Sequence, residues 1–373
     1  MNRASGGQWR AAAKKNAKAS MKELQQTGQG SNARPLKVGM IGLGGFGAHR
    51  RRTMRQTGLF RIVAGCDRNG AVLAEACAQE GAIECPTFES LLAVDGLEGV
   101  VISTGADSHA ALAVAAMQRG LHVFVEKPLC CTVGEVEQLR EVQSATQRVV
   151  GVGHHHPADD RSSRLARQHM DEGKLGKIVA YEANESHSGG LQIRPGDWRG
   201  RGDTNPGGML FHCGVHALHQ VCDLFGPVTA VSAMMRYDAH PATATADAAT
   251  VLLRHESGLL GTLNCYHVTA YCHVLRLFGT GGNLYIDKHA GRAWYQKALY
   301  GPVEPQQEMA APPAPARNSN LVSWYRAIRG EGAARPGLED GVRAVLPVFA
   351  AEVAARERRQ VMIEELSQAD AVA

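Results

Sequence analysis

Long apolar stretches are missing from this sequence. No run of apolar residues approaches the roughly 20 needed to cross a bilayer, and none near residue 1 resembles the apolar core of a secretory signal. The nine cysteines are odd in number, show no C-x-x-C spacing and include the adjacent pair Cys130 and Cys131. A disulfide framework and a thiolate zinc site are therefore not expected. These absences predict a cytoplasmic protein without a membrane partner.

An excess of charge is also missing from most of the chain. The formal net charge is +4, but residues 1–34 hold seven basic residues against one acidic residue, so this segment carries +6 and the rest carries −2. A near-neutral body argues against nucleic acid as the main partner. Residues 1–34 have little to bury, so we expect a flexible basic extension. It can be a misassigned start, an arm that wraps a partner subunit, or an organelle targeting segment.

A glycine-rich turn is the strongest local signal that the sequence does contain. Residues 36–50 have the pattern of a buried strand, a turn and the start of a helix, with glycines at the G-x-G-x-x-G spacing. Gly42 closes the turn, Gly44 lets a pyrophosphate approach the main chain, and Gly47 lets the helix pack against the strand. The free N–H groups at the helix start face the phosphates. The pattern predicts dinucleotide binding by Gly42, Gly44, Gly45, Phe46 and Gly47.

An acidic residue follows at the distance that such a site requires. The next apolar strand, 59–66, ends at Asp67, which lies 20 residues after Gly47. A carboxylate at this position accepts hydrogen bonds from the adenosine ribose and repels a 2′-phosphate, which favours NAD over NADP. Arg68 beside it can stack on adenine, or tolerate NADP.

A further buried strand carries polar residues at its carboxyl end. Residues 99–104 are apolar and β-branched, as in strands that are buried on both faces of a parallel sheet. Ligands of such sheets bind beyond the carboxyl ends of the strands. We therefore predict that Ser103, Thr104 and His109 contact the cofactor or shape its pocket. The alternative is a loop and helix cap without a ligand.

The strand 121–128 ends on a charged pair and a proline, Glu126-Lys127-Pro128. Both charged residues are predicted to bind the cofactor, and Lys127 would lie beside the nicotinamide; a surface Lys–Glu pair is the alternative. Pro128 fixes the backbone and can take a cis bond. Together with the helices and strands expected around them, these segments predict a doubly wound parallel sheet, a Rossmann domain, over residues 35–155.

The second half of the chain has the pattern of an antiparallel sheet. Alternation and β-branched content predict strands over 177–186, 228–237, 248–254, 259–267 and 273–280. Consecutive strands without helices between them favour antiparallel pairing, and one face of such a sheet needs covering. Amphipathic helices are predicted over 321–329 and 340–356, and a loop over 302–315. We therefore expect a second α/β domain over 156–373 with a large, open, mostly antiparallel sheet; 373 residues suit two domains.

In this order and spacing, the glycine turn, Asp67, residues 101–109 and the tripeptide 126–128 resemble the Gfo/Idh/MocA family of sugar and polyol oxidoreductases. The likeness runs from residue 36 to about residue 364, and the Glu-Lys-Pro tripeptide is its most specific part. It implies hydride transfer between NAD(P) and a secondary alcohol of a sugar, inositol or related polyol, with a ketone as product. It also implies subunit contacts through the open sheet, in a homodimer or homotetramer.

A helix opened by glycines is expected over residues 207–220. The family pattern for this segment resembles Gly-Gly-x-x-x-Asp-x-Gly-x-His-x-x-Asp. His216 matches this pattern, whereas His212 and His219 stand where aspartates usually do. By resemblance, His216 takes the substrate hydroxyl proton and Lys127 hydrogen-bonds the same oxygen. An ordinary pKa of about 6.5 suits imidazole to that task. His212 is the third predicted catalytic residue, although a neutral imidazole cannot support a positive charge as aspartate does.

The same histidines allow other roles. His212 and His216 are four apart and so share one face of a helix, where they can bind a metal whose shell is completed by His154, His155, His156 or Glu182. A purely structural pair is another alternative. Substrate contacts are predicted for His155, Trp198 and His212, because an indole offers a sugar a flat apolar face.

Two other functions fit this scaffold. A protein of this kind can retain NAD and cleave a glycoside through transient oxidation, with a metal assisting, or it can sense a sugar and a nucleotide while regulating a partner. Lys127 and His216 favour the oxidoreductase.

Overall fold

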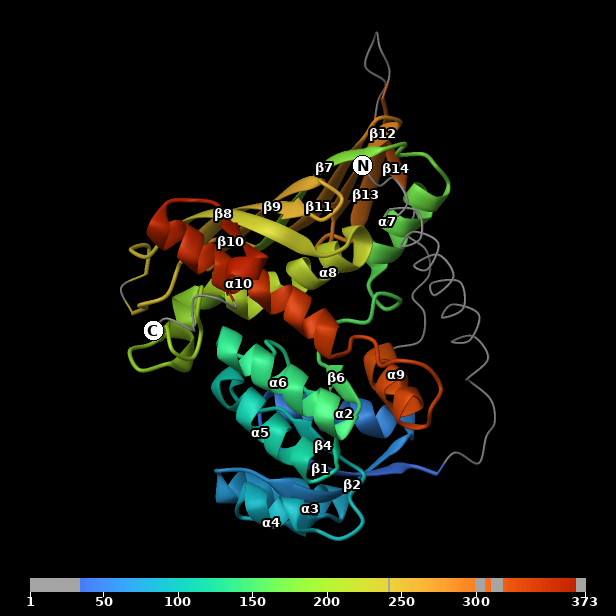
Figure 1. Cartoon of the computed structure of the whole chain (residues 1–373), viewed down its shortest axis with the longest axis vertical. Coiled ribbons are helices and arrows are strands. Elements are labelled where there is room, and N and C mark those ends of the chain that lie inside the picture. The colour runs from blue at the N-terminus through green and yellow to red at the C-terminus, as the bar shows by residue number, and fades with distance from the viewer. Residues whose placement is uncertain (1–33, 241, 299–305, 310–317, 367–373) are drawn as a thin grey trace.

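The computed structural model describes residues 34–240, 242–298, 306–309 and 318–366. The predicted extension 1–34 lies outside this part of the chain except for Arg34, as does most of the predicted loop 302–315. The described residues form two lobes, each built on one sheet (Figure 1).

The first lobe is a doubly wound parallel sheet, as predicted. Its strands follow the order β3-β2-β1-β4-β5-β6, and all five pairs are parallel. Val100, Val101 and Ile102 of the central strand β4 are fully buried because helices cover both faces. The strands are β1 Leu36–Ile41, β2 Phe60–Cys66, β3 Ile83–Glu84, β4 Gly99–Ile102, β5 His122–Val125 and β6 Val150–Val152; the helices are α2 Phe46–Thr57, α3 Gly70–Glu80, α4 Phe88–Leu92, α5 Ala106–Gln118 and α6 Val133–Thr146.

The second lobe holds a nine-stranded sheet in the order β14-β13-β12-β11-β7-β10-β9-β8-β15. Its pairs are antiparallel except β7 with β10, which confirms the prediction of a large and mostly antiparallel sheet. The strands are β7 Ile178–Ser186, β8 Val228–Arg236, β9 Ala248–His255, β10 Leu260–Tyr266, β11 Cys272–Gly279, β12 Gly282–Asp287, β13 Arg292–Lys297, β14 Gln307–Met309 and β15 Val361–Met362. The sequence pattern missed the last four, and β14 falls inside the predicted loop.

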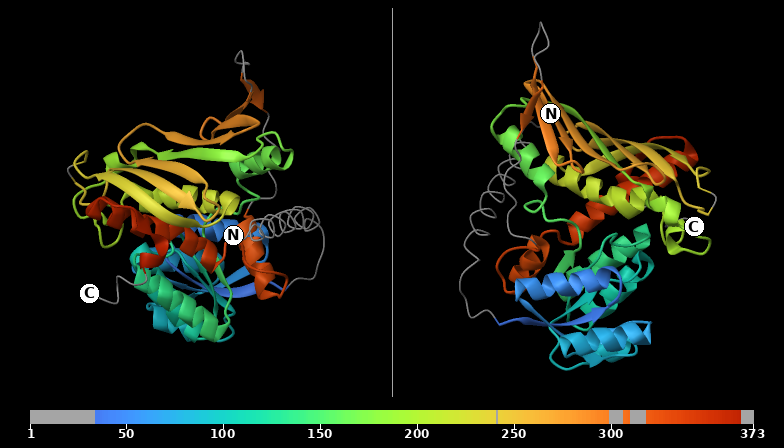
Figure 2. Two further views of the ribbon diagram at one scale, coloured as in Figure 1. Left: turned by 45° about the horizontal axis from the view of Figure 1, so that its top comes forward. Right: turned by 180° about the vertical axis from the view of Figure 1, so that it is seen from behind.

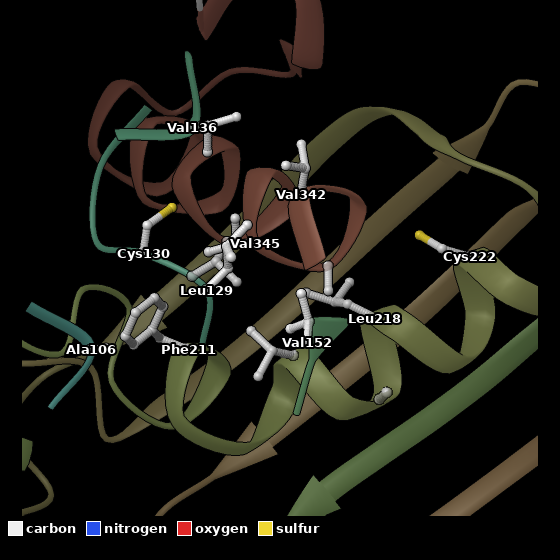
Figure 3. Close-up of a cluster of buried hydrophobic side chains, with 14 of the residues drawn as sticks. Ala106, Leu129, Cys130, Val136, Val152, Phe211, Leu218, Cys222, Val342 and Val345 are labelled. Atoms are coloured by element: carbon white, nitrogen blue, oxygen red, sulfur yellow. The ribbon is translucent and has the colours of Figure 1, made fainter. Parts of the chain in front are cut away.

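Two helices, α8 (Val215–Phe225) and α10 (Leu338–Glu357), lie between the large sheet and the first lobe (Figures 1 and 2). Figure 3 shows the apolar contact that joins the lobes, where Val342 and Val345 of α10 meet Leu129 and Val152 of the first lobe. A Cβ on Gly341 would lie 3.1 Å from Val152 and 3.3 Å from Leu129, so this crossing is tight. Leu129 comes two residues after Lys127, and the packing therefore fixes the end of β5 against the second lobe.

The large sheet presents its other face without a covering helix among the described residues (Figure 2). Along β9 the burial alternates, so Leu252 is exposed while its neighbours Val251 and Leu253 are buried. Met234 of β8 and Leu260 of β10 are exposed as well. This face is thus an open, partly apolar surface.

Helix α9 (Ser319–Ile328) returns to the first lobe. Trp324 is fully buried there and stacks on Phe60, with ring centroids 5.6 Å apart. Added Cβ atoms on Gly99 and Gly151 would lie 3.1 and 2.9 Å from this indole, which explains the glycines in β4 and β6. A helix late in the sequence therefore completes the core of the first lobe. Helix α7 (Arg161–Asp171) lies in the second lobe, and no described helix has the length and hydropathy of a membrane span.

Candidate functional site

The glycine turn after β1 is packed too closely for side chains. Gly42 has φ +81°, and a Cβ there would lie 2.4 Å from the carbonyl oxygen of Ser103. A Cβ on Gly47 would lie 2.0 Å from the carbonyl oxygen of Gly42, so the helix α2 begins directly against the turn. Gly45, at φ +49°, and Gly44 leave the outer side of the turn open. The turn thus presents main chain and a helix start, which fits a dinucleotide phosphate.

Asp67 lies beside this turn at the carboxyl end of β2. Its Oδ2 accepts a hydrogen bond of 2.7 Å from Leu43 N–H, and its Oδ1 accepts one from Asn69 N–H. The neighbouring Arg68 is exposed, as is the ring of Phe46, at 54%. These residues surround the open side of the turn, where an adenosine ribose would lie in a Rossmann domain.

The polar residues after β4 differ in whether their side chains have hydrogen-bond partners. Ser103 Oγ is buried and has no hydrogen-bond partner among the described residues, and Thr104 Oγ1 shares a bond of 2.7 Å with Ser108 Oγ. His109 is only 1% exposed, and its two ring nitrogens lie 2.7 and 3.2 Å from the carbonyl oxygens of Pro128 and Thr104. His109 therefore ties together the loops that follow β4 and β5, which fits the prediction that it shapes the cofactor pocket. Burial lowers its pKa.

Glu126 is held below the site by an arginine of α2. Its Oε1 lies 2.6 Å from both Nε and Nη2 of Arg50, and both side chains are buried. Its Oε2 has no partner among the described residues, and a Cβ on Gly153 would lie 2.3 Å from it. Arg50 and Glu126 thus form an internal ion pair, in which Oε2 of Glu126 is left as an open acceptor. Glu126 therefore does not belong to a surface Lys–Glu pair, the alternative considered on the sequence. The Lys127–Pro128 bond is cis, the isomer that the sequence allowed.

Lys127 crosses from the first lobe to the second. Its Nζ donates a hydrogen bond of 3.0 Å to the carbonyl oxygen of His212, which lies just before the start of α8. His216, one turn further on, packs edge-on against His154 and His155, with centroid distances of 5.6 and 5.1 Å. Burial, then the charge of Lys127, holds the pKa of His216 well below its ordinary value. The structure therefore brings Lys127, His216 and His155 together between the lobes.

The segment 207–220 is a helix opened by glycines, as expected, but its first part is not α-helical. Residues Leu210–Gly214 form a π-helical turn, and α8 begins only at Val215. The ring of His212 lies against Trp198, at 5.6 Å between centroids, whereas the ring of His216 lies against His154 and His155. The two histidines therefore have different ring neighbours.

Several polar residues near His212 were missed by the sequence analysis. His187 and His267 lie 6.5 and 6.0 Å from His212 by ring centroid, and His273 lies 6.3 Å from His187. These three sit at one edge of the large sheet, because parallel pairing of β7 with β10 puts both carboxyl ends there, beside the start of β11. The pattern of histidines at strand ends was visible, but the parallel pair was not expected.

A buried ion pair lies next to these histidines. Glu185 of β7 pairs with Lys288, which follows β12, and lies 3.4 Å from the imidazole of His273. Burial lowers the pKa of Lys288 to about 8. Lys288 Nζ also lies 3.5 Å from Gln220 Oε1, so the pair connects the sheet to α8.

A metal-like cluster forms here, with members different from those considered on the sequence. One ligand atom each of His187, His212 and Cys213 lies within 4.8 Å of the others. However, His187 Nδ1 accepts a hydrogen bond from Gly189 N–H, so a neutral His187 carries its proton on Nε2 and directs it at Cys213 Sγ, 3.2 Å away. A protonated Nε2 cannot bind a metal, which makes the arrangement a hydrogen-bonded pair rather than a preformed metal site.

Two family models match the chain across both lobes. Residues 36–154 match the model described as "Oxidoreductase family, NAD-binding Rossmann fold", and residues 163–285 match the "GFO/IDH/MocA C-terminal domain". The chain belongs to the GFO/IDH/MocA family. Its first lobe is accordingly the NAD-binding Rossmann domain of that family, and the glycine cradle at Gly42 and Gly47 fits this cofactor.

Relatives with assigned names are distant. An uncharacterized oxidoreductase of Schizosaccharomyces pombe is 30% identical over 150 residues, which cover 40% of this chain and 39% of that protein. The scyllo-inositol 2-dehydrogenase (NAD(+)) of Bacillus subtilis is 24% identical over 67% of this chain and 73% of its own length. The chain thus spans about two fifths of the first GFO/IDH/MocA relative and about three quarters of the second.

Solved structures share the whole architecture. Levoglucosan dehydrogenase, in a complex with NADH and levoglucosan, superposes with a TM-score of 0.78 at 20% sequence identity. The superposition covers 88% of this chain and 100% of that one. At this identity the likeness establishes the GFO/IDH/MocA fold and nothing about the substrate.

Proposed function

We propose that this GFO/IDH/MocA protein is an NAD-dependent oxidoreductase that acts on a secondary alcohol of a sugar, inositol or related polyol. The observation that carries the proposal is the contact of the Lys127 ammonium, at the end of a Rossmann strand, with the main chain of His212 just before His216. Relatives named for inositol and levoglucosan support the substrate class. The product would be a ketone.

In this mechanism His216 accepts the hydroxyl proton and Lys127 donates a hydrogen bond to the same oxygen. Bound NAD⁺ supplies the hydride acceptor. Gly42, Gly44 and Gly47 would hold its phosphates, and Asp67 its ribose. Ser103 and Glu126 each offer a buried oxygen without a partner in the described chain, and both lie near the strand ends where such a cofactor binds. Trp198, 42% exposed beside His212, offers a face for the sugar ring.

The direct test is a screen of sugars and polyols with NAD⁺, followed by the absorbance of reduced nicotinamide. We expect reduction with at least one polyol, and equal rates with and without a chelator. Turnover of a glycoside without net NADH would instead indicate the glycoside-cleaving reaction.

The pH dependence of oxidation follows from the state of His216. Only its neutral form accepts a proton, and burial with Lys127, His155, His154 and His219 as neighbours lowers its pKa well below the ordinary value. A lowered pKa keeps the base neutral as the pH falls, so kcat/KM should show no loss from His216 between about pH 8 and 6.5. A pH profile with a loss at or above about pH 6.5 that His216→Gln abolishes would contradict this assignment.

Cofactor choice is expected to depend on Asp67. In Asp67→Asn the amide oxygen can still accept from Leu43 N–H, but the bond from Asn69 N–H and the negative charge beside the ribose are lost. We expect kcat/KM for NAD to fall about 10-fold and use of NADP to rise, since a hydrogen bond to a charged group is replaced by a neutral one. Asp107→Asn, in the first turn of α5, serves as the control. Unchanged NAD preference in Asp67→Asn would place the ribose elsewhere.

We also propose that the open face of the large sheet makes the subunit contact of a homodimer or homotetramer. The exposed apolar side chains of Met234, Leu252 and Leu260 support this, because such a face is costly to leave in water. Light scattering of the wild type and of Leu252→Lys measures it directly.

A further inference from the structure

Lys127 lies among imidazoles and has no carboxylate of its own. In the described part of the chain it forms no ion pair within 4.0 Å, and its hydrogen bond to His212 goes to a neutral carbonyl. Its charge contributes to lowering the pKa of five neighbouring histidines: His154, His155, His187, His212 and His216. The charge of Lys127 is therefore felt throughout the histidine cluster between the lobes.

The acids nearest to this region are already paired. Asp197 lies 2.6 Å from Arg199, and Glu185 pairs with Lys288. Asp160 caps α7, where it accepts a hydrogen bond of 3.0 Å from Ser162 N–H. None of these carboxylates is left to balance Lys127.

Three imidazoles form a triangle next to Lys127. The ring centroids of His187, His212 and His267 are 5.7 to 6.5 Å apart. His212 Nδ1 and His267 Nε2 are buried without a hydrogen-bond partner in the described residues, and His267 is only 1% exposed. Buried polar atoms are nearly always paired, so two orphaned nitrogens in one cluster indicate a missing polar group.

We propose that the missing group is the carboxylate of the substrate, so that the enzyme acts on a sugar acid or related anionic polyol rather than on a neutral one. The carboxylate would lie between Lys127 and the imidazoles of His212 and His267, with the sugar ring against Trp198. This assignment of substrate class rests on the oxidoreductase function proposed above.

Charge distinguishes a carboxylate from the hydroxyl groups of a neutral polyol as the missing group. Hydroxyl groups can satisfy the orphaned nitrogens, but they leave Lys127 without a counter-charge. Burial and then the charge of Lys127 lower the pKa of His212 to about 3, and burial and then His187 lower that of His267 to about 4. A bound anion would offset the charge of Lys127 and that of a bound oxidised nicotinamide, and it would favour protonation of these imidazoles.

The test compares neutral sugars with their own acids. Glucose and glucuronate, galactose and galacturonate, and glucose and gluconate are assayed with NAD⁺, and binding to the protein–NADH complex is measured by calorimetry. We expect at least one acid to exceed its neutral partner about 10-fold or more in kcat/KM and in affinity, as for a charge-assisted hydrogen bond.

Two variants at one position separate charge from shape. His212→Asp places a carboxylate beside Lys127, and we expect the preference for the acid to be reversed. His212→Asn removes the imidazole without adding a charge, so the preference should shrink but keep its direction. His289→Gln, an exposed imidazole that stacks on Tyr271 at the rim, should keep the wild-type preference.

The outcomes are distinguishable. Equal or better binding and turnover of the neutral sugars by the wild type would overturn the anionic substrate and leave the oxidoreductase standing. Tight binding of an acid to the NADH complex without any turnover would overturn the oxidoreductase and support the anion site. A preference for glucose 6-phosphate over every carboxylate, or an unchanged preference in His212→Asp, would overturn the carboxylate site.

Discussion

Replacing Lys127 by methionine is expected to lower kcat/KM about 1,000-fold while the affinity for NADH changes less than about 10-fold. Methionine keeps the length of the side chain but removes the donor that polarises the substrate oxygen, and loss of a positioned acid–base group costs about 100- to 10,000-fold. The glycine turn and Asp67, which we expect to hold the cofactor, are untouched. Steady-state kinetics and NADH fluorescence measure the two quantities.

An exposed lysine provides the control for this variant. Lys177, immediately before β7, is exposed and lies outside the proposed site, so Lys177→Met should retain wild-type kinetics. A fall of less than about 10-fold in Lys127→Met would remove this side chain from the reaction. An equal loss of NADH affinity would make it a cofactor residue instead.

Truncation of Trp324 to alanine should destabilise the protein by about 3–5 kcal/mol, the range for a large aromatic side chain removed from a core. The indole is fully buried, stacks on Phe60 and meets Phe124 edge-on at 5.6 Å. Gly99 and Gly151 make room for it, and neither has a side chain that could fill the space it leaves. Denaturant unfolding followed by circular dichroism measures the loss.

A conservative variant at position 324 tests whether the loss of stability comes from the loss of aromatic packing. Trp324→Phe keeps an aromatic ring against Phe60 and should recover more than half of the loss seen in Trp324→Ala. A loss below about 1 kcal/mol in the alanine variant would mean that α9 does not complete the core of the first lobe, contrary to the packing described here.

The fold was largely predictable from the sequence because its signals are local. The buried runs of β1, β4 and β5 predict strands of a parallel sheet, and the glycines mark a turn that has no room for a Cβ at Gly42. The docking of α9 was not predictable in detail, because it depends on Trp324 meeting glycines more than 170 residues earlier in the chain. The strands β12 to β15 are short or interrupted by turns, and their pattern was too weak.

The candidate site was predicted less completely because it depends on pairing and on helix type. The sequence predicted a helix here but not its π turn at Leu210–Gly214, nor the contact of the His212 ring with Trp198. His187 and His267 come together only because β7 and β10 run parallel, which the sequence did not indicate. The bonds of His109 to two main-chain carbonyls, which fit a role in shaping the pocket, could not be read from its position in the sequence.

The most direct test of the central claim, hydride transfer at Lys127 and His216, follows deuterium. Sugars, polyols and sugar acids that carry deuterium on their secondary carbinol carbons are incubated with the protein and NAD⁺, and the nicotinamide is examined by NMR. The account predicts deuterium at C4 of the NADH ring with the wild type, and about 1,000-fold slower transfer with Lys127→Met. Transfer at an unchanged rate in that variant, or no deuterium in the cofactor with any substrate that is consumed, would contradict it.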